Sequence, residues 1–350
     1  MRMLSKPRID AHPELSASGA VLTSHPVIKP EMIGFLLAPR FSMLAFTCAV
    51  EPLRVANRLA QCELYQWQTI SSDGQPVAAS NHMAVIADRS IREPVEFNRV
   101  AVCAGFEPEA LYEARIAGWL RQLARAGVAL GAIDTGSFVL AHAGLLDGYR
   151  AATHWESLEG LRVQFPKVAI TPDLFVVDRT RFTCAGGTAA LDMMLHVVRL
   201  SHGHRLAAAV AEQFIHTRMR EAREHQRMAS GERQGVKESW LARMIEMMEA
   251  NIDEPLAMGE LCAAVAVTAR RCERGFQRQL RTSARRYYLD LRLQRARALL
   301  QYTTLPVLDT AVACGFRSLS HFSRQYKRWA GVPPSADRAL MHQGVPPILS

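Results

Sequence analysis

A strand-to-helix turn near the middle of the chain carries the residue best placed to do chemistry. In the segment GVALGAIDTGSFVLAHAGLLDG, residues 127–148, an apolar run ends at Asp134, and apolar residues at helical spacing follow. Many hydrolases hold their nucleophile at such a turn, because the turn exposes one side chain beside a helix N-terminus. Asp134 is neither serine nor cysteine. The pattern therefore predicts the strand-to-helix turn of an enzyme active site without a nucleophilic side chain at the turn.

The groups around this turn favour the binding of a zwitterion. A helix that begins after the turn offers backbone N–H groups at Thr135, Gly136 and Ser137, which suit a ligand carboxylate. The Asp134 carboxylate suits a ligand cation or amine instead. Together these groups favour a zwitterionic metabolite such as an amino acid or a betaine.

Three further side chains are candidates for the same pocket. Trp155 and Phe138 would provide a cation–π wall for a quaternary amine, although each aromatic ring is also compatible with a place in the core. Glu51, in AVEPLR, is either an acid of the pocket or a charge on a helix surface. Both alternatives stay open for each residue.

The remaining histidines and cysteines predict no metal or cofactor site. His196, His202 and His204 lie close together in the sequence, but no cysteine or carboxylate completes a ligand set at a suitable spacing. The seven cysteines include no C-x-x-C pair, which is typical of reduced thiols in a cytosolic protein. Cys184, in TCAGG, is either a buried thiol or a redox sensor.

Short β-rich runs alternate with helical patterns between residues 30 and 200. The segments 32–39, 65–74, 83–91 and 99–105 indicate strands, whereas 43–61 and 109–127 have helical spacing. This alternation predicts an α/β fold, in which a largely parallel sheet is covered by helices on both faces. The sheet would place the Asp134 turn at the carboxyl end of a strand.

Charge is divided unevenly along the 350 residues, which are enough for two domains. Residues 237–350 hold 17 Lys and Arg against 10 Asp and Glu, whereas the other 236 residues hold 25 against 23. A basic part beside a nearly neutral part indicates a polyanionic partner for the basic part. The sequence has no apolar run of about 18 residues, so we expect no membrane partner and a cytoplasmic location.

Two segments of the basic part have the pattern of helix-turn-helix units. In VLDTAVACGFRSLSHFSRQYKRW, Gly315 permits a turn, and Ser318 is a candidate N-cap for the next helix. That helix has one aromatic face and one polar or basic face, which suits the DNA major groove. The polar face holds Ser320, His321, Arg324, Lys327 and Arg328.

The second segment, MGELCAAVAVTARRCERGFQRQL, repeats this plan about 50 residues earlier. Thr268 is the candidate N-cap, and Arg270, Arg271, Arg274 and Arg278 are the basic positions. Two such units, joined by an amphipathic helix over residues 287–300, predict binding to double-stranded promoter DNA.

These residues carry a resemblance to a known family. ACGFRSLSHFSRQYKRWAGVPPSADR and RRYYLDLRLQRARALL resemble the DNA-binding domain of the AraC/XylS family. The resemblance implies that both recognition helices enter successive major grooves. It assigns DNA contacts to six residues: Arg270, Glu273 and Arg274 in the first helix, and Ser320, His321 and Arg324 in the second.

The first unit departs from the family pattern at three positions. Ala266 stands in place of a turn glycine, Arg281 in place of a glycine and Ala284 in place of a proline. These departures put the geometry of the first unit in question.

Residues 32–200 resemble the ThiJ/PfpI group of class I glutamine amidotransferase-like, flavodoxin-like folds, as fused to an AraC domain in GlxA-type regulators. The segments that carry this resemblance are GFLLAPRFSMLAFTCAVEPLRVAN, GAIDTGSFVLAHAGLLDGYRAATHWE and FTCAGGTAALDMML. Enzymes of this fold have a cysteine where this chain has Asp134, and a carboxylate where it has Ala45. His154, in THWE, is retained. Without a thiolate the nucleophilic route has no attacking atom.

The sequence therefore predicts a transcriptional regulator of five parts. They are a disordered tail (1–29), a sensing domain (30–203), a helix and linker (204–236), an all-α DNA-binding domain (237–341) and a second tail (342–350). We expect a homodimer that senses a small molecule, contacts RNA polymerase at the nucleoid and activates transcription. The alternative is an amidase or hydratase of the ThiJ/PfpI type fused to a DNA-binding domain.

Overall fold

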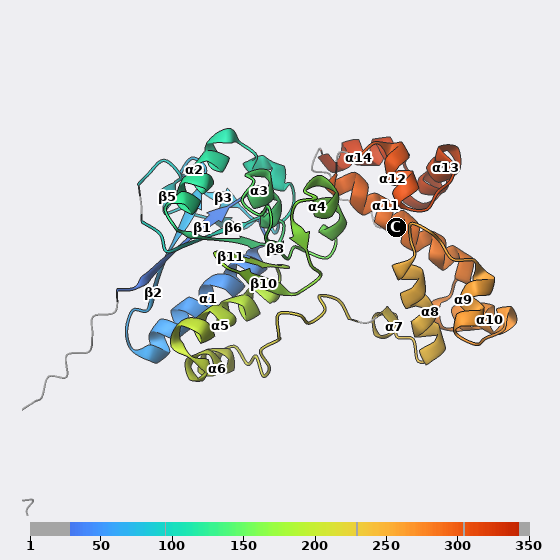
Figure 1. Cartoon of the computed structure of the whole chain (residues 1–350), viewed down its shortest axis with the longest axis horizontal. Coiled ribbons are helices and arrows are strands. Elements are labelled where there is room, and N and C mark those ends of the chain that lie inside the picture. Colours follow the sequence, from blue (N-terminus) through green and yellow to red (C-terminus); the bar gives the residue numbers. More distant parts are fainter. Residues whose placement is uncertain (1–28, 95, 229, 304, 343–350) are drawn as a thin grey trace, which may run out of the picture.

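The computed structural model describes residues 29–94, 96–228, 230–303 and 305–342. They form an α/β domain followed by an all-helical domain (Figure 1). The two expected tails, 1–29 and 342–350, lie outside the described residues except for residues 29 and 342. The predicted fold class is confirmed.

A seven-stranded sheet forms the centre of the first domain. Its strands stand in the order β10-β11-β7-β6-β1-β2-β5, and among the described strands of this sheet only β10 runs antiparallel to its neighbour. The strands are β1 (Glu31–Leu37), β2 (Tyr65–Ser71), β5 (Arg89–Ser90), β6 (Arg99–Cys103), β7 (Ala129–Ile133), β10 (Phe175–Asp178) and β11 (Arg181–Cys184). Two short ribbons accompany the sheet: β3 (Val77–Ala78) with β4 (Ala84–Val85), and β8 (Arg150–Ala151) with β9 (Ala169–Ile170).

Helices cover both faces of this sheet, which explains why its central strands are apolar on both sides (Figure 1). One face packs against α1 (Met43–Ala60) and α5 (Ala189–His202), and α6 (His204–Gln213) packs on these two helices. The other face packs against the 3-10 helix η1 (Pro108–Leu111), α2 (Ala114–Arg125), α3 (Gly136–His142) and α4 (Leu158–Gln164).

The helix expected over 109–127 is wrong as one continuous element. The chain leaves the helical path at Tyr112 and Glu113, between η1 and α2. The Tyr112 ring stacks on His142 of α3, with their centroids 4.0 Å apart. This tertiary contact overrides the local helical pattern.

Residues 214–228, the strap, lie on the α/β domain. Asp192 of α5 has a fully buried side chain and pairs with His216 at 2.9 Å and with Arg220 at 2.6 Å. Gln226 donates a hydrogen bond to the carbonyl oxygen of Thr153 at 2.9 Å. These contacts tie the strap to the first domain over most of its length, because a buried carboxylate requires its partners.

The short helix α7 (Ser230–Arg233) belongs to the other side of the junction, because it packs on α8. Arg233 pairs there with Glu249. The stretch expected to be a helix and linker, 204–236, therefore consists of α6, the strap and α7, each in contact with one of the domains.

In the part of the second domain that the structure describes there are seven helices: α8 (Ser239–Ala250), α9 (Met258–Ala264), α10 (Ala269–Leu280), α11 (Ala284–Tyr302), α12 (Val307–Ala313), α13 (Leu319–Ala330) and α14 (Pro334–His342). They build two small cores, one around Phe276 and one around Phe322 and Tyr326. The long helix α11 contributes to both cores and joins them.

Each helix-turn-helix unit has its turn in the left-handed conformation. Gly315 has a φ of 72°, and its Cα lies so close to the carbonyl of Ile252 that a Cβ would stand 2.6 Å from that oxygen. Ala266 and Arg281 adopt φ values of 53° and 56° at the positions where the family has glycine. The first unit thus keeps the turn geometry, at the cost of backbone strain in two residues that carry a Cβ.

Replacing Ala266 by glycine should therefore stabilise the protein. We expect Ala266→Gly to raise the free energy of unfolding by about 0.5 to 1 kcal/mol, because glycine accepts a positive φ without the Cβ clash. Denaturant titration of the full chain measures this change. Ala263→Gly, within α9, is the matched control and should destabilise the protein by about 1 kcal/mol. Equal destabilisation by both substitutions would contradict the strain assigned to Ala266.

Candidate functional site

The Asp134 turn is shaped by close backbone packing at the carboxyl ends of β6, β7 and β11. Asp134 has a φ of 62°, which directs the chain sharply from β7 into α3. A Cβ at Gly136 would lie 2.1 Å from the carbonyl oxygen of Val102, and one at Gly186 would lie 2.6 Å from the Asp134 carboxylate. Only glycine fits at these two positions, so the two neighbouring loops close tightly around Asp134.

Hydroxyl groups brace this turn from within. Thr135 donates to the carbonyl of Gly105 at 2.7 Å, and Thr153 donates to the carbonyl of Asp134 at 3.0 Å. Ser137 donates to the same Asp134 carbonyl at 3.4 Å. Thr135, Ser137 and Thr153 are all buried. Their hydroxyls therefore fix the backbone rather than face a ligand. Of the predicted anion site only the backbone N–H groups of Gly136 and Ser137 remain, because the Thr135 N–H donates to the Asp134 carboxyl.

The surroundings of Asp134 favour the neutral, protonated form of its carboxyl. Burial raises the pKa of Asp134 to about 7, the Thr135 backbone N–H lowers it, and the Glu156 carboxylate raises it again. A desolvated carboxyl with this pKa gains most from a cationic partner, because the partner stabilises its ionised form.

The loop between β8 and α4 supplies the neighbouring side chains. The backbone N–H of Glu156 donates to Nδ1 of His154 at 3.4 Å, and burial lowers the pKa of His154, so the imidazole is neutral at pH 7. Trp155 is partly exposed, and the Arg227 guanidinium lies over its ring at 3.9 Å from the centroid. Arg227, which the sequence did not single out, occupies the cation position expected at Trp155.

Two predicted pocket residues lie elsewhere. Phe138 is fully buried in the core and packs edge-on against Phe165, which agrees with the core alternative and leaves it no place in a cation–π wall. Glu51 forms an ion pair with Arg54 along α1 at 2.6 Å, and its side chain is 41% exposed. The described residues show no contact between Glu51 and the Asp134 group, which agrees with the surface-charge alternative.

The cysteines beside the turn are poor nucleophiles. Cys103 and Cys184 end β6 and β11, on either side of β7, and both are fully buried. Burial raises the pKa of Cys184 to about 12 and holds the pKa of Cys103 well above its usual value. A reactive thiol needs the opposite shift.

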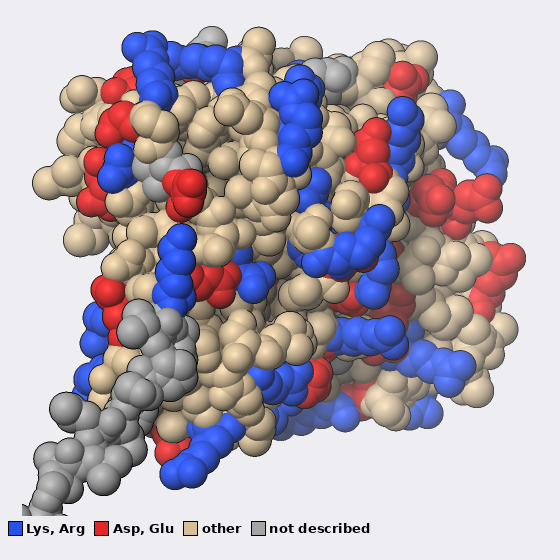
Figure 2. Space-filling model, turned by 60° about the vertical axis from the view of Figure 1, so that its left-hand side comes forward, with Lys and Arg blue, Asp and Glu red and all other residues tan. Residues whose placement is uncertain are grey.

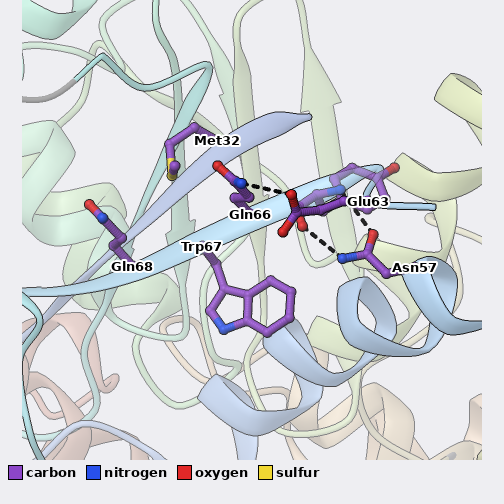
Figure 3. Close-up of a pocket in the computed structure, with 7 residues that line it drawn as sticks. Met32, Asn57, Glu63, Gln66, Trp67 and Gln68 are labelled. Carbon is purple, nitrogen blue, oxygen red and sulfur yellow. Dashed lines mark hydrogen bonds between the residues drawn. The ribbon is translucent and has the colours of Figure 1, made fainter. Parts of the chain in front are cut away.

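A hollow of about 300 Å³ lies at the other edge of the sheet (Figure 3). Its floor is the start of β2, where Asn57 accepts hydrogen bonds from the Leu64 and Tyr65 N–H groups and Gln66 donates to Glu63. These polar groups already have partners. Ligands of open α/β sheets bind at the carboxyl ends of the strands, so the Asp134 end is the better candidate.

The two predicted recognition helices have the required faces. In α10, Cys272 and Phe276 are buried, whereas Arg270, Glu273 and Arg274 are exposed. In α13, Phe322 and Tyr326 are buried, and the exposed residues are Ser320, His321, Arg324 and Lys327. The N-caps predicted for these helices, Thr268 and Ser318, both accept a hydrogen bond from the backbone three residues later.

A basic groove accompanies α10. It is lined by Arg271, Arg274 and Arg278 together with Glu238, and encloses about 710 Å³. Arginines at this spacing share one helix face and suit the phosphates of a DNA strand. By contrast, Figure 2 views the molecule from the side of the first domain, and on this face basic and acidic side chains are interspersed.

The part of the chain that the structure describes has no helix long and apolar enough to cross a membrane. Among the same residues, no group of three or more His, Cys, Asp or Glu side chains is placed to hold a metal ion.

The pKa of Asp134 predicts a pH-dependent stability. Its carboxyl holds a proton up to about pH 7 in the folded chain, against 3.8 for the ordinary group. The folded state therefore binds more protons between these values, and stability falls as the pH rises from about 4 to 7.

Asp134→Asn should remove this fall and be the more stable form above pH 7, by on the order of 1–3 kcal/mol. Denaturant titrations at pH 4.5 and 8 measure the difference. The exposed control Glu96→Gln should show no such gain, and an equal gain in both variants would contradict the assignment.

Comparisons with known proteins agree with both domains. The DJ-1/PfpI family model matches residues 31–200, and a helix-turn-helix domain model matches residues 261–339. A ThiJ/PfpI family protein from Pseudomonas syringae, 19% identical, superposes with a TM-score of 0.50 over 72% of this chain and 97% of its own. That likeness shows the fold of the first domain.

Two relatives span nearly the whole chain. The HTH-type transcriptional regulator CdhR of Pseudomonas aeruginosa is 45% identical over 307 residues, which are 88% of this chain and 91% of CdhR. The regulator GbdR of the same species is 42% identical over 320 residues, which are 91% of this chain and 87% of GbdR. The chain therefore belongs to the DNA-binding HTH-type transcriptional regulators in which a DJ-1/PfpI domain precedes an AraC-type helix-turn-helix domain.

Proposed function

We propose that the first domain senses a small zwitterionic metabolite at Asp134 and thereby controls how the second domain binds promoter DNA. The observation that carries this proposal is the Asp134 carboxyl itself. It stands at the strand-to-helix turn where enzymes of the same fold place a cysteine, and it is desolvated without being paired to a basic residue among the described contacts.

The groups near Asp134 match the two ends of a zwitterion. Asp134 suits the cationic end, and the Trp155 ring holds the Arg227 guanidinium in place by a cation–π contact. The Arg227 guanidinium, the neutral His154 and the backbone N–H groups of Gly136 and Ser137 suit the carboxylate end, whereas Thr135 supports the Asp134 carboxyl itself. A ligand with both charges would satisfy Asp134 and Arg227 together, whereas a singly charged molecule would leave one of them without a partner.

The same geometry supports a domain without catalytic activity. Attack on a carbonyl would require a thiolate or an activated hydroxyl at the turn. The turn has a carboxyl instead, Thr135 and Ser137 donate to backbone carbonyls, and the neighbouring thiols are buried. An amidase or hydratase, the alternative function, would lack its nucleophile at this turn.

The second domain would contact DNA through α10 and α13. Arg270, Glu273 and Arg274 on α10, and Ser320, His321, Arg324 and Lys327 on α13, are our candidates for these contacts. A homodimer would read a repeated site, and contact with RNA polymerase would make the protein an activator. We place this action at the nucleoid, in the cytoplasm.

Loss of one recognition-helix arginine should weaken specific DNA binding. We expect Arg324→Ala to cost about 1–3 kcal/mol, because an arginine in the major groove loses contacts to base edges or phosphates. Gel-shift titration on a promoter fragment selected with the wild-type protein, at fixed salt, measures the loss. Arg125→Ala removes the same charge from the exposed side of α2 and should leave the affinity unchanged. Equal affinities for wild type and Arg324→Ala would contradict the placement of α13.

A thermal-shift screen of amino acids and methylated amines, glycine betaine included, tests the sensing role. We expect at least one zwitterion to raise the melting temperature of the full chain, since a ligand that binds only the folded state stabilises it. Its affinity, measured by calorimetry, should rise between pH 6 and 8 as Asp134 ionises, and it should fall in Asp134→Asn. Undiminished binding by Asp134→Asn would make the aspartate a structural turn residue.

A further inference from the structure

Tyr302 is the last residue of α11, a helix of the second domain, but its side chain is buried in the core of the first domain. Its side chain is 7% exposed and belongs to the core of the α/β domain, together with Leu161 and Phe165 of the α4 region. Leu299 and Leu300, one turn earlier, pack in the core of the helical domain. The end of α11 therefore crosses from one core into the other.

The contact of α11 with α4 is close and specific (Figure 1). Gly160 of α4 faces Tyr302, and a Cβ at Gly160 would lie 2.8 Å from the Tyr302 Cβ and 3.1 Å from its carbonyl oxygen. Gln164 donates a hydrogen bond to that carbonyl. At the other side of the contact, Arg295 of α11 pairs with Glu159 of α4 at 2.9 Å.

The Tyr302 side chain belongs to the same core as Phe138 of α3, the helix that follows the Asp134 turn. It lies beside the Ser157 hydroxyl, at the end of the loop that carries His154 and Trp155. Burial raises the pKa of the phenol above its usual value, and the carboxylates of Glu156 and Asp134 lie near enough to raise it further. The residue of the helical domain thus borders the group that would bind the ligand.

The strap makes a second link between the pocket and the helical domain. Arg227, whose guanidinium covers the Trp155 ring, is also within electrostatic range of Glu249 in α8 and Tyr287 in α11. A ligand carboxylate that pairs with Arg227 would therefore act on a side chain that faces both domains.

We propose that the docking of α11 on α4 closes the approach to the Asp134 carboxyl, so that a docked Tyr302 and a ligand at Asp134 exclude each other and ligand entry releases α11 from α4. This inference rests on the proposed sensing function for its ligand, and on the α4–α11 contact for its mechanism. Because α11 joins the two helix-turn-helix units, its release changes the orientation of both units relative to the first domain. The recognition residues are exposed in the docked state, so docking fixes their direction rather than covers them.

Thiol labelling tests the closure without any ligand. In the full chain, Asp134→Cys places a thiol at the pocket, and Cys62→Ser removes the exposed native cysteine. Labelling with iodoacetamide is followed at each cysteine by peptide mass spectrometry. In this background Gly160→Val, which drives α4 away from Tyr302, should speed labelling at position 134 by about tenfold or more. The reason is that a closed site reacts only in the fraction of molecules in which it is open, and this substitution raises that fraction. Tyr302→Ala should do the same from the other side of the contact.

Two controls separate undocking from unfolding. Gly118→Ala, in α2, adds a methyl group that meets nothing within 4 Å and should leave the labelling rate unchanged. The buried Cys103 and Cys184 should stay unlabelled in every variant that keeps its fold. Glu159→Arg should speed labelling as Gly160→Val does, and adding Arg295→Glu, which restores the ion pair with reversed charges, should slow it again.

The outcomes distinguish this inference from the proposed function. Unchanged labelling at position 134 in Gly160→Val and Tyr302→Ala, with domains shown to separate by small-angle X-ray scattering, would overturn the closure and leave a purely structural contact. Faster labelling would support closure even if no zwitterion binds, in which case the proposed ligand class alone would fail.

Discussion

The α/β domain depends on a steric constraint at the carboxyl ends of β6, β7 and β11. No Cβ fits at Gly136 or Gly186, so the backbone around the turn closes to contact distance. This closure forces Asp134 into a positive φ and removes water from its carboxyl, which raises its pKa to about 7. The turn thus holds a desolvated carboxyl where the resemblance to ThiJ/PfpI enzymes implies a cysteine.

The helical domain depends on α11 in a similar way. Arg292 of α11 donates to the carbonyls of Cys314 and Gly315 at 2.8 and 2.7 Å and lies over the Phe316 ring. Tyr288, also on α11, lies against the loop after α8 and donates to the carbonyl of Asn251. One helix therefore holds both helix-turn-helix units, and whatever moves α11 moves both units together.

Local pattern was sufficient for much of the fold. The strand predicted at 32–39 and the helix at 43–61 agree with β1 and α1 within two residues, because periodicity and caps act over short distances. The helix break at Tyr112 was missed, since it follows from a ring stack with His142, thirty residues away. The docking of Tyr302 was missed for the same reason, because its partner Gly160 is distant in the sequence.

The candidate site was predictable in part. Asp134 and the loop with His154 and Trp155 could be found from the strand–turn–helix pattern and the resemblance. Arg227 could not, because its position over Trp155 depends on the path of the strap, which the buried Asp192 fixes. The place of Phe138 stayed open because a helix pattern alone does not tell which apolar side chain faces the core, where the structure buries it.

The central claim is that the docking of α11 on α4 closes the approach to Asp134. Hydrogen exchange of the wild-type chain and of Gly160→Val, followed by mass spectrometry, tests it most directly, because local opening appears as faster amide exchange. The account predicts faster exchange in two peptides at once, 131–141 around the turn and 290–303 in α11. Faster exchange in 290–303 with an unchanged 131–141 would contradict it.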